Sequence, residues 1–288
     1  MYKGWLIYNE EDYKKNEVYA KMLMDYGKEN ELDIELILRE DLILGVDGVE
    51  LVIDKQGERM KSPHFAINRS RDSQLAKQLE YMKCKVFNSS QVTEIANDKG
   101  ITHQFINRLG ITSVPTLFYN KTYMDLARCI KAYPVVIKSV GGHGGEEVYK
   151  VNNIEEAQSA IDKIKSEKLL IQKLCNRVGV DVRVFVIGNE IIGAIKRSSE
   201  EDFRSNYSLG GKASPYALNQ EEMKRVYRIL EHLACDFVGI DFMIDAEGNF
   251  VFNEIEDAVG SRTLYQYTEV DSASLYIQHI KKEYLKCI

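Results

Sequence analysis

The chain of 288 residues is poor in several residue types that mark particular classes of protein. Its five cysteines are scattered, odd in number and lack CxxC spacing, which predicts reduced thiols and argues against a disulfide framework or a zinc site. The five histidines are equally dispersed, so a histidine-based metal site has little support. Only four prolines occur, which predicts lobes packed together rather than lobes tethered by extended linkers.

Long apolar runs are also missing. No stretch approaches the roughly 20 apolar residues that a membrane-spanning helix needs, and charge follows the short apolar start at once, unlike a signal peptide. We therefore expect a cytoplasmic protein without membrane contact. The net charge of −6 argues against broad nucleic-acid binding. Hydrophobic residues at 44% and charged residues at 28% are typical of globular proteins.

The length and the pattern of the chain predict three α/β lobes. Strands alternate with helices over residues 1–88, which indicates a small parallel α/β lobe. A central lobe is expected over 89–174 and a third lobe over 175–288. Helices are expected at about 13–28, 73–83, 122–131, 154–165 and 219–234, within 89–111, and from about 271.

The third lobe contains an acidic segment, VGIDFMIDAEGNFVFNEIED, that is typical of a β-hairpin. Its register can bring Asp241 beside Glu254, and Glu256 shares a face with Glu254. Three converging carboxylates repel one another unless a cation lies between them, and hard oxygen ligands suit Mg²⁺ held with phosphates. A solvated acidic hairpin explains this segment equally well when it is taken alone.

A glycine-rich loop with a preceding lysine lies in the central lobe. Lys138 can supply a point charge for a phosphate, and glycines let backbone amides approach phosphate oxygens. A strand follows the loop, so it matches neither a Walker loop nor a Rossmann fingerprint, and a hairpin turn without a ligand is the alternative. The loop glycines assigned to the nucleotide are Gly141, Gly142, Gly144 and Gly145.

Other polar residues fit the same picture, although each has an ordinary surface explanation. Lys99 lies near a helix start, where it can hold a phosphate. The connector of Gln172, Lys173 and Leu174 offers backbone groups for an adenine edge. Cations that can complement the carboxylates follow in the third lobe, and we assign Lys196 and Arg204 to the nucleotide.

Taken in order, these segments resemble the ATP-grasp ligases, specifically the RimK-like branch. The resemblance covers about residues 64–258, and DFRSN followed by GG, after a hairpin that ends in KR, is its most specific part. The matching segments are FNSSQVTEIANDKGITHQFINRLGI, VVIKSVGGHGG, IQKL, GVDVRVFVIGNEIIGAIKR, DFRSNYSLGG, VGIDFMI and FNEIE.

The resemblance implies an ATP-grasp fold with nucleotide held between the central and C-terminal lobes. It implies ATP as a substrate and one or two Mg²⁺ ions, for which Mn²⁺ can substitute, with Glu254 bridging. It further implies a ribose-side role for Asp181. Arg183 alternates with Asp181 on one strand face and is also assigned to the nucleotide, with surface cross-strand pairing as the alternative for both. Lys138, Arg204 and Asn206 would act in catalysis. Residues that would face the substrate are Asn68, Arg69, Arg197 and Arg262.

One position departs from the family pattern, because Glu256 stands where the family has asparagine. Glutamate still offers an oxygen ligand, but it adds a negative charge and lacks the amide donor. Arg262 can then either bind a substrate carboxylate or neutralise Glu256 and Asp257. The departure leaves metal number and substrate identity open.

The implied activity is the joining of a carboxylate and an amine, on an amino acid or a peptide, through an acyl phosphate. Two alternatives remain open: a graspetide-type enzyme that cyclises a peptide through its side chains, and an ATP-binding regulatory module without turnover. Members of the family often form dimers or tetramers, and the oligomeric state of this chain stays open.

Overall fold

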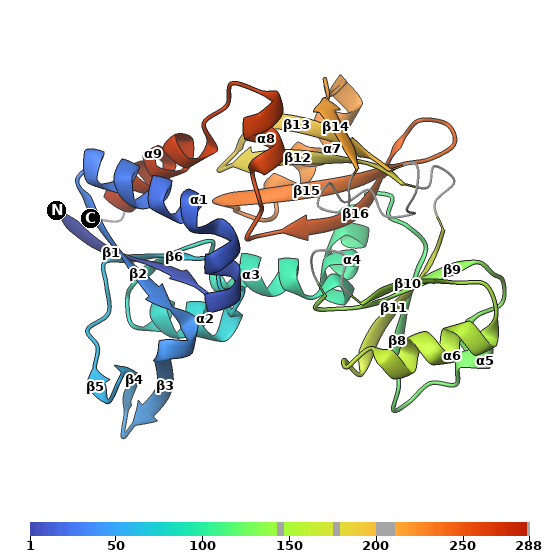
Figure 1. Cartoon of the computed structure of the whole chain (residues 1–288), viewed down its shortest axis with the longest axis horizontal. Helices are drawn as coiled ribbons and strands as arrows, with labels where there is room; N and C mark the ends of the chain where they lie inside the picture. The colour runs from blue at the N-terminus through green and yellow to red at the C-terminus, as the bar shows by residue number, and fades with distance from the viewer. Residues whose placement is uncertain (143–146, 175–178, 200–210, 287–288) are drawn as a thin grey trace.

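The computed structural model describes residues 1–142, 147–174, 179–199 and 211–286. Figure 1 shows three lobes, with the N- and C-terminal lobes in contact and the central lobe set apart on one side. Within the described part of the chain, no helix is long and apolar enough to cross a bilayer.

The N-terminal lobe is a parallel sheet between two helices, as the sequence predicts. Its strand order is β2-β1-β6-β7. Leu23 of α1 packs on the sheet face of Leu6, while Leu75 of α2 packs on the face of Ile7. The elements are β1 (Tyr2–Tyr8), α1 (Glu10–Glu29), β2 (Leu32–Leu38), β6 (Phe65–Asn68), α2 (Ser73–Tyr81) and β7 (Lys85–Phe87).

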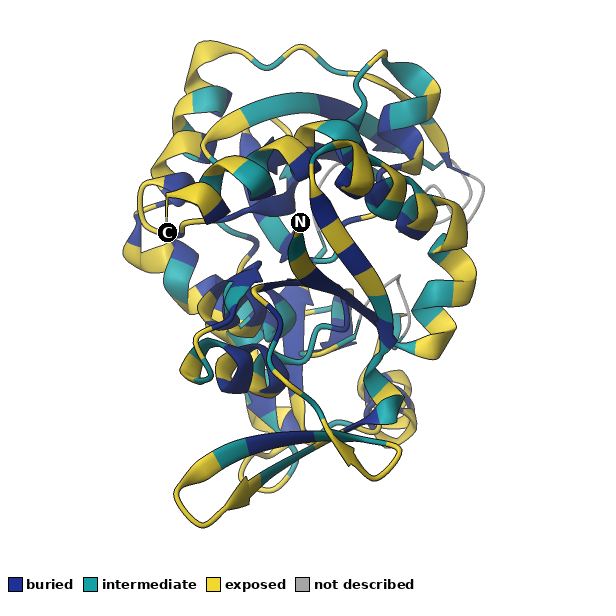
Figure 2. Ribbon diagram, turned by 90° about the vertical axis from the view of Figure 1, so that its left-hand side faces the viewer, coloured by how far each residue is buried: buried dark blue, intermediate teal, exposed yellow. Residues whose placement is uncertain are grey.

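A small antiparallel sheet projects from this lobe, and the sequence analysis made no prediction for it. It consists of β3 (Leu42–Asp47), β4 (Glu50–Lys55) and β5 (Glu58–Arg59), preceded by the 3-10 turn η1 (Arg39–Asp41). Gly48 has a φ of +61° in the turn between β3 and β4, a conformation that glycine adopts without strain. Figure 2 shows that most of this sheet lies away from the body of the molecule.

The central lobe is an antiparallel sheet of order β10-β9-β11-β8 with helices on one face. Its core joins Ile137 and Ile171 to Ala157 and Ile161 of α6. The helix predicted at 122–131 is a single turn, α5, which Asp125 caps. The elements are β8 (Thr116–Asn120), α5 (Leu126–Cys129), β9 (Val135–Ser139), β10 (Val148–Val151), α6 (Ile154–Lys163) and β11 (Lys168–Lys173).

The C-terminal lobe is a five-stranded antiparallel sheet of order β14-β13-β12-β15-β16. The predicted hairpins and helices are present, whereas β14 and α8 were not predicted. The elements are β12 (Val180–Ile187), β13 (Glu190–Ser198), β14 (Lys212–Pro215), α7 (Gln220–Leu230), β15 (Phe237–Ile244), β16 (Phe250–Glu256), α8 (Arg262–Tyr267) and α9 (Ser272–Leu285).

Two shared cores join this sheet to the rest of the chain. On one face, Val182 and Phe242 pack against α7 and against the helices α3 (Ser90–Asn97) and α4 (Lys99–Arg108). On the other face, Phe185 and Phe237 pack with the N-terminal lobe, α8 and α9. The central lobe has a core of its own. Helices α3 and α4, which lie within the central lobe predicted over 89–174, therefore pack with the C-terminal sheet, and the lobe boundaries stay a prediction.

Candidate active site

The acidic hairpin forms as predicted, and a bulge sets which side chains meet. Near the turn, Phe242 pairs with Phe252, but after a register shift Asp241 pairs with Glu254. Without this shift, Asp241 would lie opposite Asn253, since the pairing would continue in step. The bulge therefore places Asp241, Glu254 and Glu256 on one face of the sheet, while Phe242 and Phe252 stay in the core on the other face.

A second bulge acts in the same way on the neighbouring hairpin of β12 and β13. The register shifts between Phe185 and Val186, so Asp181 pairs with Arg197 and Val182 pairs with Lys196. Arg197 thereby joins the face of Asp181, whereas Lys196 lies on the opposite face with Val182. The structure thus does not bring Lys196 to the carboxylates, and its assignment to the nucleotide stays a prediction.

The two arginines and the aspartates form a buried ion-pair network. Arg183 donates to both oxygens of Asp241, at 2.8 and 2.7 Å, and also to Glu256 Oε1 at 2.6 Å. Arg197 donates to both oxygens of Asp181, at 2.7 and 2.6 Å, and to Asp241 Oδ2 at 2.7 Å. Glu256 therefore forms an ion pair with Arg183, which it shares with Asp241. Arg262 is exposed at the start of α8.

Two buried lysines approach the same carboxylates from the other side. The ammonium of Lys99, at the N-terminus of α4, lies 3.4 Å from Glu254 Oε2 and donates to the carbonyl of Gly142. Lys138, on β9, donates to Asn253 Oδ1 at 3.4 Å, and Asn253 is the extra residue of the β16 bulge. The predicted phosphate lysines and metal acids thus converge between the central and C-terminal lobes.

Burial and neighbouring charges shift the pKa values of these groups. Desolvation lowers the pKa of Lys138 from 10.5 to about 8, although the nearby carboxylate of Glu254 acts to raise it. Desolvation opposes ionisation of Asp241, but Arg183 and Arg197 outweigh it and lower its pKa to about 2. Glu256 differs, because desolvation outweighs Arg183 and raises its pKa.

The predicted adenine connector is only partly described. Gln172 is buried, and its amide nitrogen contacts His103 Nε2 at 3.0 Å and donates to Thr116 Oγ1 at 2.8 Å. Its neighbour Lys173 is exposed, and Leu174 is half-buried. Sequence reasoning missed His103, whose pKa burial lowers to about 4, so that the imidazole is neutral.

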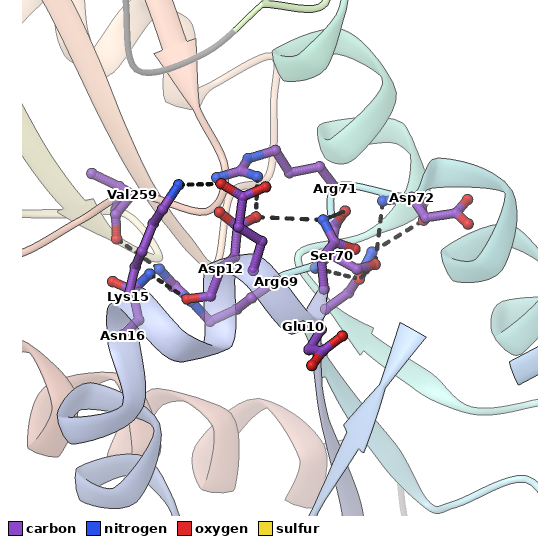
Figure 3. Close-up of polar contacts among 12 residues, drawn as sticks. Glu10, Asp12, Lys15, Asn16, Arg69, Ser70, Arg71, Asp72 and Val259 are labelled. Atoms are coloured by element: carbon purple, nitrogen blue, oxygen red, sulfur yellow. Dashed lines mark hydrogen bonds and ion pairs between the residues drawn. The ribbon is translucent and has the colours of Figure 1, made fainter. Parts of the chain in front are cut away.

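The two residues of the N-terminal lobe predicted to face the substrate are Asn68 and Arg69, and both contact other residues of the chain; Figure 3 shows Arg69 with its partner Val259. Arg69 is buried, donates to the carbonyl of Val259 at 2.9 Å, and stacks over the rings of Tyr8 and Tyr19. The Asn68 side chain accepts from Ser70 Oγ at 2.7 Å. Their predicted contact with the substrate stays a prediction, and the bond to Val259 joins this lobe to the segment after Glu256.

Several predicted residues lie outside the described part of the chain. These are Arg204, Asn206, Gly144 and Gly145. Gly141 is exposed and Gly142 half-buried at the start of the glycine-rich loop.

The donor set fits a hard divalent cation. Asp241, Glu254 and Glu256 each offer an oxygen, and these atoms lie within 4.8 Å of one another. Carboxylate oxygens beside lysines suit Mg²⁺ held together with phosphates. Three lone-pair sites of Asp241 already accept from arginines, so Glu254 and Glu256 offer the more open oxygens.

Comparisons with known proteins agree with this geometry. A family model described as the RimK-like ATP-grasp domain matches residues 96–280. "Uncharacterized protein MG011 homolog" of Mycoplasma pneumoniae is 27% identical over 263 residues, covering 91% of this chain and 86% of the relative. "Probable alpha-L-glutamate ligase 2" of Shewanella amazonensis is 29% identical over 214 residues, covering 72% and 71%.

Among solved structures, the VanG D-Ala:D-Ser ligase from Enterococcus faecalis superposes with a TM-score of 0.77 at 18% identity, over 98% of this chain and 99% of that one. The family match and the fold together define an ATP-grasp ligase, as the sequence predicts. Because the family model matches more than half of its length, the chain belongs to the RimK-like ATP-grasp family.

Proposed function

We propose that the protein joins a carboxylate and an amine on an amino-acid or peptide substrate, with release of ADP and phosphate. The observation that carries the proposal is the convergence of Lys99 and Lys138 with three carboxylates between two lobes. Cations that hold phosphate oxygens beside acids that hold Mg²⁺ are what a metal–triphosphate site requires.

The reaction would proceed in two steps without a protein nucleophile. The substrate carboxylate attacks the γ-phosphorus of ATP, so that a P–O bond forms and ADP leaves. An amine then attacks the acyl carbon, and phosphate leaves as the amide forms and the amine loses a proton. Lys138 and Lys99 would hold phosphate oxygens, while Arg204 would stabilise the tetrahedral intermediate. Bound Mg²⁺ would neutralise the charge of the phosphates.

Substrate class draws support from the relatives. A protein 29% identical to this chain is named a probable alpha-L-glutamate ligase, and the VanG enzyme is a D-Ala:D-Ser ligase. Both names describe amino-acid substrates, so single amino acids and short peptides are the first compounds to test.

A binding module without turnover is the second candidate, and one observation favours it. Asp241 accepts bonds from two arginines, and Glu256 carries a charge that the family's asparagine lacks. In that case ATP would bind, while no pair of carboxylate and amine would stimulate ADP release.

The test is a screen of ADP release across amino acids and dipeptides, with mass spectrometry of the products. We expect stimulated ADP release and a product whose mass equals two substrates less one water. Tight ATP binding without stimulation by any pair would support the binding module instead. Loss of one water from a single peptide would indicate cyclisation.

Glu254→Gln supplies a sharper test of the metal assignment. We expect turnover to fall at least a hundredfold, because the neutral amide binds Mg²⁺ poorly. Glu247→Gln, an exposed position in the turn of the same hairpin, is the matched control and should keep its activity. Unchanged turnover of the Glu254 variant would refute the role of this residue.

A further inference from the structure

A cavity lies between α4 and β8, beside the predicted adenine connector, since His103 and Thr116, which contact Gln172, are part of its lining. Its volume is about 530 Å³, within the range of small-molecule sites. One face of α4, the segment 111–116 and Phe118 form its walls. Among the described residues, none of those assigned above to the nucleotide, the metal or the substrate lines it.

The lining favours an anion with an apolar body. Ile111 and Val114 are buried in the wall, and Phe118 is 43% exposed. Arg108 has no hydrogen-bond or ion-pair partner within the described part of the chain, and no acidic residue lines the cavity. In a chain with a net charge of −6, a positively charged hollow without acids complements a carboxylate or sulfonate.

The walls come from two different bodies of the molecule. Ile106 of α4 and Leu109, the residue just after α4, belong to the core that includes the C-terminal sheet. Phe118 lies on β8 of the central sheet, whose core is separate.

The segment 111–116 between these walls forms backbone hydrogen bonds with both lobes. The backbone of Phe252, on β16, donates to the Thr112 carbonyl at 2.9 Å, and Lys173, on β11, donates to the Pro115 carbonyl at 3.1 Å. The cavity therefore lies at the junction about which the central lobe would move. A ligand that touches both walls has an affinity that depends on the relative position of the two bodies.

We propose that this hinge cavity is a regulatory site for a small organic anion with an apolar body, and that its occupancy is coupled to nucleotide binding. The coupling acts through the position of the central lobe, so it goes beyond the proposed ligase activity. Linkage requires the effect to be reciprocal: nucleotide must change the affinity for the anion by the same factor as the anion changes the affinity for nucleotide.

The probe is 8-anilinonaphthalene-1-sulfonate, an aromatic sulfonate whose fluorescence reports binding. We expect Arg108→Glu to weaken its binding at least tenfold, because the charge at the cavity reverses. Thr112→Trp, which fills the cavity from an exposed position of its lining, should abolish binding. Arg128→Glu on α5 is the matched control, since the side chain of Arg128 is 87% exposed and does not line the cavity. The affinity of this variant for the dye should stay within twofold of that of the native protein.

The coupling is measured by repeating the titration with saturating Mg²⁺ and a non-hydrolysable ATP analogue. We expect the dissociation constant of the dye to change at least threefold, with the reciprocal change for the analogue. The proposal would be overturned if the analogue displaced the dye and Arg108→Glu left the affinity for the dye unchanged, because the dye would then bind at the nucleotide site. Equal dye affinity with and without nucleotide would overturn the regulatory role. Both measurements are binding constants, so their outcome does not depend on whether the protein has ligase activity.

Discussion

At the scale of residues, the site is a balance of charge rather than an acidic patch. Asp181, Asp241, Glu254 and Glu256 stand against two arginines and two lysines, all of them buried or half-buried. Arg183 is central, because it contacts Asp241 with two nitrogens and Glu256 with one of them. Glu256, the position that departs from the family pattern, thus meets a cation that already belongs to the network.

Because of this arrangement, we expect the two partners of the Arg183–Glu256 pair to contribute unequally to the stability of the protein. Arg183→Gln leaves the buried carboxylate of Asp241 with one arginine, so we expect a loss of roughly 3 kcal/mol in the free energy of unfolding. Glu256 is 29% exposed on its side chain, so Glu256→Gln should cost about 1 kcal/mol or less. Urea unfolding monitored by circular dichroism measures both. Equal losses would contradict the central position of Arg183.

At the scale of elements, the sequence predicted most of the strands around the candidate site, but not the bulges that set their register. Alternating apolar residues and the turn at 245–249 identified the acidic hairpin, and the ATP-grasp fold was predicted correctly. One bulge decides which cation lies opposite Asp181. With the bulge between β12 and β13, Arg197 pairs with Asp181, whereas Lys196 would pair with it if the register did not shift. A bulge is stabilised by packing on both sheet faces, so the period of the strand does not reveal it.

Other elements were missed for reasons that differ. Asp47-Gly48 between two apolar runs is a hairpin signal for β3 and β4, and the sequence analysis made no prediction from it. Helix α8 has six residues, too few for a helical period to register. The contacts of Asn68 and Arg69 within their own lobe depend on tertiary packing, which a family pattern does not show.

One buried side chain, Asn88, hydrogen-bonds between β7 and β15 and gives a prediction for these elements. Asn88, just after β7, accepts from the backbone of Asp236 and Phe237, at 2.6 and 3.0 Å. It donates to the carbonyls of Phe237 and Asp257, at 2.8 and 3.2 Å. Asn88→Ala should therefore destabilise the protein by about 3 kcal/mol, because buried backbone groups lose their partners.

The control for this joint is Asn30→Ala at the end of α1, where the side chain makes one hydrogen bond, to the Tyr26 carbonyl. We expect it to cost less than about 1 kcal/mol in the same urea titration. If both alanine variants lost the same stability, the hydrogen bonds of Asn88 would not stabilise the contact between β7 and β15.

At the scale of the molecule, the distribution of cores divides the chain into two bodies. One core contains Leu6 and Phe65 of the N-terminal lobe together with Phe185 and Phe237 of the C-terminal lobe, so these lobes cannot separate without exposing it. The central lobe has its own core, and Figure 1 shows it beside the larger body. Lys138 of the central sheet and Glu254 of the C-terminal sheet lie on opposite sides of this division.

Nucleotide would bridge the two bodies, so its binding should be visible in hydrogen exchange. With Mg²⁺ and a non-hydrolysable ATP analogue, we expect amides of β9 and β11 to exchange at least tenfold more slowly, because a ligand of the closed form suppresses opening of the smaller body. Amides of β12 and β15, in the shared cores, should change little. Lys138→Ala should abolish the protection of β9 and β11. Equal protection of all four strands would mean that the chain opens as one body, which the separate core of the central lobe argues against.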